Sequence, residues 1–191
     1  MPGIPTDVRS ERLILRSMGV DVMRTIVDGR PEDAANHLGF AIHADMFGED
    51  GGAPKHFPGM LEREPDFALW GPRAIVLANE KLVIGHIGFH TLPNQQYLEE
   101  YVIRGVEMGY TVFAEYRRRG YATEAITALV SWANVAHGVE NIVISVGTDN
   151  GPSLALAKKL GFIKVGEHQD DVDGLEIVFN LSSESINTHT S

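Results

Sequence analysis

The residues best suited to chemistry in this 191-residue chain form a short basic segment. In order they are Arg117, Arg118, Arg119, Gly120, Tyr121 and Ala122, and they lie between a predicted strand and a predicted helix. The first N–H groups of a helix lack intrahelical acceptors and lie at the positive end of its dipole, so they favour an anion. The segment therefore predicts a phosphate-binding loop. A solvated run of charge before a simple helix start explains the same residues about equally well.

The segment differs from the two best-known phosphate-binding patterns. It is not a Walker loop, because no Gly-Lys-Ser/Thr follows it. It is not a dinucleotide fingerprint either, because only one glycine, Gly120, lies at the turn. Gly120 nevertheless permits close approach of the backbone, and the small Ala122 keeps the first helical turn uncrowded.

A carboxylate that could accept a proton, Glu107, lies on the predicted strand before this loop. Alternation along a strand places Glu107, Gly109 and Thr111 on one face. That face either lines a cleft or is solvated, and the sequence leaves both interpretations open. In a cleft, the Glu107 carboxylate would be a candidate general base.

A second polar group begins a compact helix. Asn150 is expected to be its N-cap, Pro152 suits its first turn, and Gly161 provides a left-handed stop. Ser153 lies in the first turn, where its hydroxyl could serve the helix start or a ligand. For Asn150 both roles can hold at once.

The elements that position these residues are predicted from apolar periodicity and turn signals. Helices are expected as two short pieces between Val20 and about Met46, then around Gly59–Arg63, over Gly120–Ala136 and after Asn150. Strands are expected at Arg12–Arg16, Arg73–Ala78, Leu82–Leu92, Tyr101–Val112, Asn141–Val146, Phe162–Val165 and Leu175–Phe179. A loop over Gly48–Pro58, a polar turn over Asp170–Gly174 and a polar tail over about 181–191 complete the pattern. Residues 1–191 are thus predicted to form a single α+β domain.

Composition narrows the class of function. The formal net charge is −10, from 16 basic and 26 acidic residues, which argues against nucleic acid and weakly favours a cationic partner. The chain has no cysteine, no apolar run of roughly 18 residues and no basic, apolar N-terminal signal, so we expect a cytoplasmic protein without a membrane partner. No His-Glu-x-x-His or comparable spacing predicts a metal site.

The ordered motifs resemble those of the GNAT acetyltransferase superfamily. The segment Arg117–Ala122 matches the pattern Arg/Gln-x-x-Gly-x-Gly/Ala, and the match continues through Thr123-Glu124-Ala125, Asn150-Gly151-Pro152-Ser153 and Leu160-Gly161-Phe162. Upstream, Arg12-Leu13-Ile14-Leu15-Arg16, Ile84-Gly85-His86-Ile87-Gly88 and Glu107-Met108-Gly109-Tyr110 look like the branch that acetylates N-termini of ribosomal proteins. The similarity covers roughly Arg12 to Phe179.

The resemblance implies the GNAT fold, a central mixed, mostly antiparallel, splayed β-sheet flanked by helices. It implies acetyl-CoA as co-substrate, with its pyrophosphate on the backbone N–H groups of Arg117–Ala122. The pantetheine arm would bond the backbone of Tyr110, Thr111 and Val112. Asn150 and Ser153 match positions that face this arm.

The resemblance also implies direct attack of a primary amine on the thioester, with both substrates bound together. Glu107 is the candidate base and a backbone N–H near Val112 the candidate oxyanion donor. Many relatives use a tyrosine to protonate the leaving thiolate, at the position that Ala157 occupies here. Ser153, water or unassisted departure would replace it. Ser145 stands where some relatives place a glutamate base.

The acceptor is the least determined part of the prediction. The branch resemblance favours a protein N-terminus, and an amino acid, polyamine or aminoglycoside is the alternative. A non-catalytic acyl-CoA sensor is a third hypothesis, because the tyrosine counterpart is absent. Phe40–Trp70 and Pro93–Tyr101 are the regions expected to select the acceptor, and both a monomer and a homodimer fit the sequence.

Overall fold

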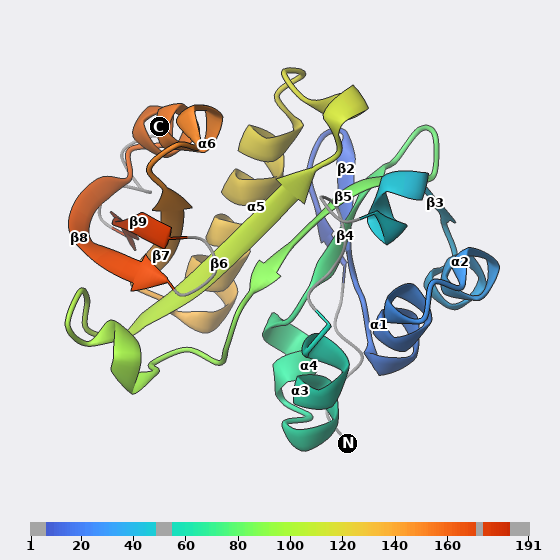
Figure 1. Ribbon diagram of the computed structural model, residues 1–191, viewed down its shortest axis with the longest axis horizontal. Helices are drawn as coiled ribbons and strands as arrows, with labels where there is room; N and C mark the ends of the chain where they lie inside the picture. Colours follow the sequence, from blue (N-terminus) through green and yellow to red (C-terminus); the bar gives the residue numbers. More distant parts are fainter. Residues whose placement is uncertain (1–6, 49–54, 171–173, 184–191) are drawn as a thin grey trace. The chain divides into compact units, whose positions relative to one another are not determined.

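The computed structural model describes residues 7–48, 55–170 and 174–183 (Figure 1). These residues pack into two compact units. The first unit comprises the described residues up to His90 together with Tyr110–Leu129, and the second comprises Thr91–Gly109 and the described residues from Val130 onward. The prediction of a single domain over 1–191 stays a prediction.

The elements follow the predicted order. The first unit contains β1 (Val8–Arg9), β2 (Leu13–Ser17), α1 (Val20–Val27), α2 (Pro31–Leu38), β3 (Ala41–Ile42), the 3-10 helix η1 (Ala44–Phe47), α3 (Phe57–Arg63), α4 (Phe67–Trp70), β4 (Arg73–Leu77), β5 (Leu82–Phe89) and η3 (Ala114–Tyr116). The second contains η2 (Gln96–Leu98), β7 (Asn141–Gly147), α6 (Gly151–Lys159), β8 (Ile163–Asp170) and β9 (Gly174–Ser182). Strand β6 (Gly105–Val112) and helix α5 (Tyr121–His137) have residues in both units.

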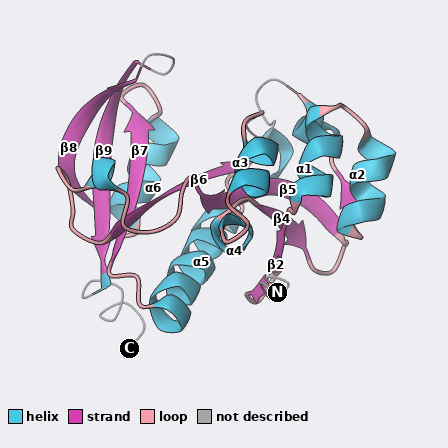
Figure 2. Cartoon of the chain, turned by 90° about the horizontal axis from the view of Figure 1, so that it is seen from below, coloured by secondary structure: helices cyan, strands magenta, loops and turns pink. Residues whose placement is uncertain are grey.

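The first unit is built on a sheet in which β1, β2, β4 and β5 pair antiparallel in that order. The short β3 adds a parallel pairing to β5. Helices α1 and α2 lie side by side on one face of this sheet (Figure 2). Every residue of β4 is buried, as its continuous apolar run predicts for a central strand.

Arg73, the first residue of β4, is a charged residue buried in the apolar core. Its side chain is 1% exposed, and its guanidinium donates to the carbonyls of Leu69 (2.9 Å) and Leu15 (3.4 Å). Burial lowers the pKa of Arg73 to about 10, because the charged form loses hydration. The side chain thereby links β4 to β2 and to the end of α4.

Two glycines of β5 allow a close backbone approach. A Cβ on Gly85 would lie 2.1 Å from the Thr111 carbonyl oxygen, and one on Gly88 would lie 2.7 Å from the Gly71 carbonyl oxygen. No side chain fits at either distance. Gly85 therefore sets how β5 lies against the last residues of β6.

The second unit is a smaller mixed sheet. Strand β6 pairs parallel with β7 from Gly105 to Glu107, and β9 pairs antiparallel with both β7 and β8. A small buried cluster consists of Leu98, Val143 and Val178, and Tyr101, Val102 and Val165 pack against it. A Cβ on Gly166 would lie 2.5 Å from the Tyr101 ring, so this segment lies close against β8.

The predicted fold class is confirmed, since the strands form an open, mostly antiparallel mixed sheet with flanking helices. The prediction that the second of the two early helices extends to about Met46 was wrong, because α2 ends at Leu38. Ala41–Ile42 is a strand, because its backbone bonds to β5, and Ala44–Phe47 is a 3-10 helix. Three of the predicted segments lie partly outside the described residues. They are the turn over Asp170–Gly174, the loop over Gly48–Pro58 and the tail. Within the described residues, no helix has the length and apolarity that crossing a membrane requires.

Candidate active site

The loop between β6 and α5 presents a row of backbone donors. Arg118 and Gly120 have φ values of 61° and 84°, in the left-handed region, which turns the chain sharply before the helix. The first α-helical bond runs from the Glu124 N–H to the Gly120 carbonyl at 3.0 Å. In the described chain, the N–H groups of residues 118–123 have no acceptor, as expected for the residues at a helix start.

The three arginines of this loop have different surroundings. The Arg117 Nε donates to the Val112 carbonyl at 2.8 Å, so this side chain is turned back onto the end of β6. The Arg119 guanidinium lies over the Tyr116 ring, 5.6 Å from its centroid. Arg118 and Arg119 are exposed. Two cationic side chains are therefore accessible beside the free N–H groups.

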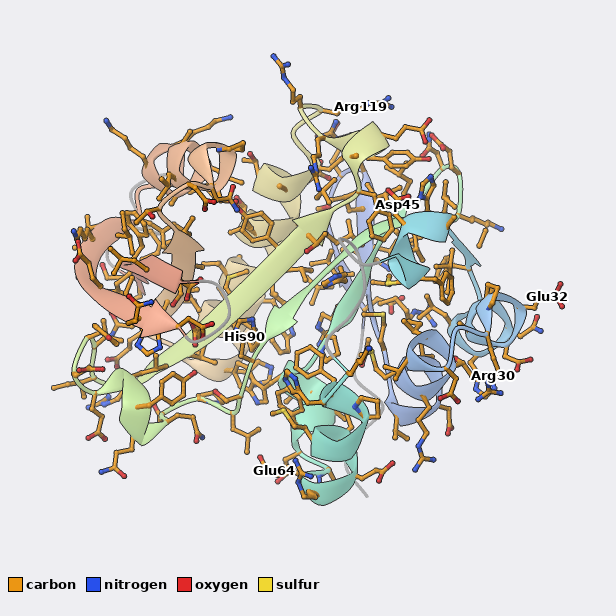
Figure 3. The ribbon with its side chains drawn as sticks, in the orientation of Figure 1. Arg30, Glu32, Asp45, Glu64, His90 and Arg119 are labelled. Atoms are coloured by element: carbon orange, nitrogen blue, oxygen red, sulfur yellow. The ribbon has the colours of Figure 1, made fainter. Side chains whose placement is uncertain are left out.

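An aromatic cluster supports the beginning of the loop. The His43 ring lies 5.6 Å from the ring centroids of both Phe113 and Tyr116, and its Nε2 lies 3.3 Å from a Glu115 carboxylate oxygen. His43 Nδ1 accepts the Asp45 backbone N–H at 3.2 Å. Figure 3 labels Asp45 and Arg119, one on η1 and the other on the β6–α5 loop. The contact between His43 and Glu115 was not predicted, because it joins segments about 70 residues apart.

In the second unit, Glu107 accepts two hydrogen bonds from hydroxyl groups. Ser145 Oγ donates to one carboxylate oxygen at 2.6 Å, and the Tyr97 hydroxyl donates to the other at 2.9 Å. Glu107 is paired with Val143 across β6 and β7, so Ser145, two residues further, lies on the same face. The predicted base and the noted serine are thus brought together.

Tyr97 is the residue of this group that sequence reasoning missed. It lies in η2, within the segment Pro93–Tyr101 that was expected to select the acceptor. Its side chain is 48% exposed, so a ligand can reach the ring. Burial of the hydroxyl, followed by the negative charge of Glu107, raises the pKa of Tyr97 above its usual value. The phenol therefore remains a hydrogen-bond donor at neutral pH.

The start of α6 matches the predicted cap. Asn150 Oδ1 accepts the Ser153 backbone N–H at 3.2 Å, and Gly161 has a φ of 83° after the helix. The Ser153 hydroxyl has no hydrogen bond to any described residue. Ala157 is buried, with 1% exposure. No group of three metal-ligating side chains lies together among the described residues.

The family model described as "Acetyltransferase (GNAT) domain" matches residues 12–163. The chain belongs to the GNAT acetyltransferase family. An uncharacterised N-acetyltransferase of Bacillus subtilis (strain 168), YoaA, is 38% identical over 97 residues, which are 51% of this chain and 49% of that protein. The chain thus spans about half the length of the curated relatives it matches.

Solved GNAT structures share the fold across nearly the whole chain. The ribosomal-protein-S5-alanine acetyltransferase of Vibrio fischeri has a TM-score of 0.64 and 16% identity, covering 94% of this chain and 97% of its own. A mutant spermidine N-acetyltransferase of Vibrio cholerae, SpeG, has a TM-score of 0.66 and 11% identity, covering 95% and 100%. At these identities the likeness shows the fold alone.

Membership of the GNAT family confirms the resemblance drawn from the ordered motifs. The matched region contains Arg117–Ala122, Glu107 and Ser153. The roles of these residues stay predictions, as does the assignment to the ribosomal-protein branch. The buried Ala157 stands at the position where the resemblance places the tyrosine acid of other GNAT enzymes.

Proposed function

We propose that this chain transfers the acetyl group of acetyl-CoA to a primary amine, and that its acceptor is the α-amine of a protein N-terminus. The observation that carries the proposal is the loop of free backbone N–H groups at residues 118–123 in a chain of the GNAT family. Such a loop suits a pyrophosphate, because it offers several donors and the positive end of a helix dipole to one anion.

The residues around the loop fit acetyl-CoA. Exposed Arg118 and Arg119 add positive charge beside the N–H groups. The pantetheine arm would bond the backbone of Tyr110, Thr111 and Val112. Since the Arg117 side chain already donates to the Val112 carbonyl, that side chain supports the strand end rather than the phosphates. Asn150 and Ser153 are proposed to contact the arm as well.

Glu107 is proposed as the general base. An attacking amine must be neutral, and a carboxylate can take its proton directly or through water. The Ser145 hydroxyl donates to one carboxylate oxygen of Glu107 and the Tyr97 hydroxyl donates to the other. They also hold the carboxylate in one orientation. Ser153, whose hydroxyl is available, is the candidate donor to the thiolate.

The need for a neutral amine favours an α-amine over a lysine side chain. The α-amine has a pKa of about 7.7–8.0, compared with about 10.4 for lysine. At neutral pH a larger fraction of the α-amine is therefore already neutral, and less proton removal is asked of the base. The fold shared with a protein named as a ribosomal-protein-S5-alanine acetyltransferase supports the same acceptor class.

A small polyamine is the second candidate acceptor. The net charge of −10 suits a cationic molecule, and the spermidine N-acetyltransferase of Vibrio cholerae has a comparable TM-score. A non-catalytic sensor of acyl-CoA is the third candidate, because Ala157 stands at the position of the tyrosine acid.

Thiol release from acetyl-CoA with matched acceptors tests the proposal. The set contains a peptide with a free α-amine and no lysine, the same peptide with a blocked α-amine and one internal lysine, and spermidine. We expect release with the first peptide and a much slower rate with the other two. Faster thiol release with spermidine would show that the acceptor is a polyamine and not a protein N-terminus. Binding of acetyl-CoA without thiol release in the presence of any of the amines would favour the non-catalytic sensor.

A further inference from the structure

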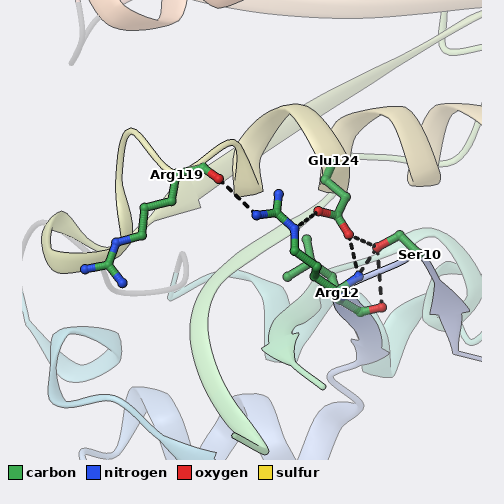
Figure 4. Close-up of polar contacts among 5 residues, drawn as sticks. Ser10, Arg12, Arg119 and Glu124 are labelled. Carbon is green, nitrogen blue, oxygen red and sulfur yellow. Dashed lines mark hydrogen bonds and ion pairs between the residues drawn. The ribbon is translucent and has the colours of Figure 1, made fainter. Parts of the chain in front are cut away.

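The first turn of α5 is fixed to the turn between β1 and β2 by one carboxylate. One Glu124 oxygen accepts the Ser10 hydroxyl and the Arg12 backbone N–H, each at 2.7 Å. The other accepts Arg12 Nε at 2.7 Å (Figure 4). These three bonds join residues more than 110 positions apart, and all of them lie within the first unit.

The same arginine also contacts the loop before the helix. Arg12 donates from a terminal nitrogen to the Arg119 carbonyl at 3.2 Å. Its guanidinium carbon lies 4.6 Å from the centroid of the Tyr121 ring. Figure 4 shows the Arg119 side chain extending away from Arg12, so the contact is made by the Arg119 backbone alone. Arg12 thereby holds both the last loop residues and the first helical residue.

The bond to the Arg119 carbonyl fixes the orientation of the next N–H group. No described peptide bond is cis, and in a trans peptide the C=O and the following N–H point in opposite directions. Since the Arg119 carbonyl points to Arg12, the Gly120 N–H points away from it. Gly120 has a left-handed φ of 84°, which residues with a side chain rarely adopt. A Cβ at this position would also lie 3.3 Å from an Arg12 nitrogen, so glycine suits both the backbone and the contact.

The ion pair also changes the charge at the start of the helix. An uncompensated carboxylate on the first turn would repel a pyrophosphate bound at the same N–H groups. Burial alone would raise the pKa of Glu124, but the hydrogen bonds from the Arg12 backbone, Ser10 and the Arg12 side chain outweigh burial and lower it. Glu124 is therefore a charged group that is paired at neutral pH.

We propose that Arg12 is a positioning residue for acetyl-CoA, which orients the Arg119–Gly120 peptide toward the pyrophosphate while its pairing with Glu124 offsets the carboxylate charge. This inference rests on the proposed binding of acetyl-CoA at the loop. The role assigned to Arg12 is carried by its bonds to the protein, because its Nε and one terminal nitrogen are used by Glu124 and the Arg119 carbonyl. Glu124 anchors the arginine in this position.

Titration calorimetry with acetyl-CoA is the first test, on the wild-type chain, Arg12→Met and Arg12→Lys. We expect about a tenfold weaker affinity for Arg12→Met, because a charge-assisted contact to the loop is lost. Arg12→Lys should be intermediate, since one ammonium cannot reproduce the planar set of donors. Arg9→Met is the control, because Arg9 is exposed and its one ion pair with a described residue is to Asp7, and the affinity of this variant should equal that of the wild type.

The second test separates positioning from general stability. The rate is measured with acetyl-CoA and with S-acetylpantetheine, which lacks the pyrophosphate. Arg12→Met should raise KM for acetyl-CoA with kcat unchanged, and should leave kcat/KM for S-acetylpantetheine at the wild-type value. An equal loss with both thioesters, or an unchanged KM for acetyl-CoA, would overturn the inference. If the wild-type chain itself does not bind acetyl-CoA, the proposed function is wrong and the inference with it.

Discussion

At the scale of single residues, Glu107 is held by donors from two other elements. Ser145 comes from β7 and Tyr97 from η2, and each donates to a different carboxylate oxygen. A carboxylate bonded in this way has a fixed orientation, which general-base catalysis requires. Tyr97 is partly exposed and lies in the segment expected to select the acceptor, so its bond to Glu107 joins that segment to the proposed base.

Replacing Glu107 by Gln removes the proposed base while keeping the size of the side chain. We expect kcat/KM to fall by about a hundredfold near pH 7, the lower end of the range for general-base catalysis. The loss should shrink as the pH rises above the pKa of the acceptor amine, because the amine is then already neutral. A pH–rate profile of both proteins measures this.

The control for that substitution is Glu167→Gln on β8, whose carboxylate is exposed and pairs with Lys164. Its profile should match that of the wild type. An unchanged rate for Glu107→Gln at every pH would remove the assignment of the base.

Tyr97 should be among the last tyrosines to ionise. Its raised pKa means that the folded chain keeps a proton that the unfolded chain releases near pH 10. Its contribution to the free energy of unfolding is therefore present below about pH 10 and is lost as the pH rises further. In a spectrophotometric titration up to about pH 10.5, Tyr97→Phe should form as much phenolate as the wild type. A deficit in the variant over that range contradicts the assigned surroundings.

At the scale of elements, β5 determines how the last residues of β6 are held. Gly85 lies where a Cβ would meet the Thr111 carbonyl oxygen, and Thr111 belongs to the stretch proposed to bond the pantetheine arm. The glycine therefore serves both the fold and the proposed cofactor site. This is a backbone requirement that the sequence motif Ile84–Gly88 contains but does not explain.

Gly85→Ala is expected to lower the free energy of unfolding by roughly 1–3 kcal/mol, because the added methyl group overpacks two backbones. It should also weaken acetyl-CoA binding through the displacement of Thr111. Gly59→Ala is the matched control. Gly59 lies in α3, where the nearest atom to an added Cβ is a flexible Arg63 nitrogen at 3.4 Å, and alanine favours helix. Urea denaturation of the two variants decides, and equal stability of both would contradict the close approach.

Local sequence signals predicted the elements with strong periodicity or clear caps. The bounds of α5, predicted from its apolar spacing, and those of α6, predicted from Asn150 and Gly161, are confirmed within a residue or two. Strand β3 was missed because its two residues are strand only through pairing with β5. Strand β6 begins at Gly105 instead of Tyr101, because Tyr101 and Val102 pack against the buried cluster of Leu98, Val143 and Val178 before the strand begins.

The sequence predicted one part of the candidate site and missed another. The loop Arg117–Ala122 was visible as a motif. The bonds from Tyr97 to Glu107 and from Arg12 to Glu124 were not visible, because both depend on how the chain folds and neither follows from a periodicity or a motif.

At the scale of the whole molecule, the net charge and the local charge of the loop oppose each other. The chain carries −10 overall, which repels an anionic cofactor and attracts a cationic acceptor. The proposed binding of acetyl-CoA would then depend on the N–H groups of residues 118–123 and on nearby Arg118 and Arg119. We expect the same net charge to make KM for a cationic acceptor depend on the salt concentration.

Raising sodium chloride from about 50 mM to about 500 mM should raise KM for a peptide acceptor with several lysines, because salt screens the attraction. KM for a neutral peptide with the same N-terminal residues should change little. Initial rates at saturating acetyl-CoA give both values. A cationic peptide whose KM is independent of salt would contradict a role for the net charge in acceptor binding.

We infer that backbone N–H groups at the start of α5 bind the pyrophosphate of acetyl-CoA. The test is to follow the amide resonances of residues 118–123 by NMR during titration. We predict large shifts at these amides with acetyl-CoA and none with S-acetylpantetheine. Saturable binding of acetyl-CoA that leaves these amides unshifted would show that the pyrophosphate binds elsewhere.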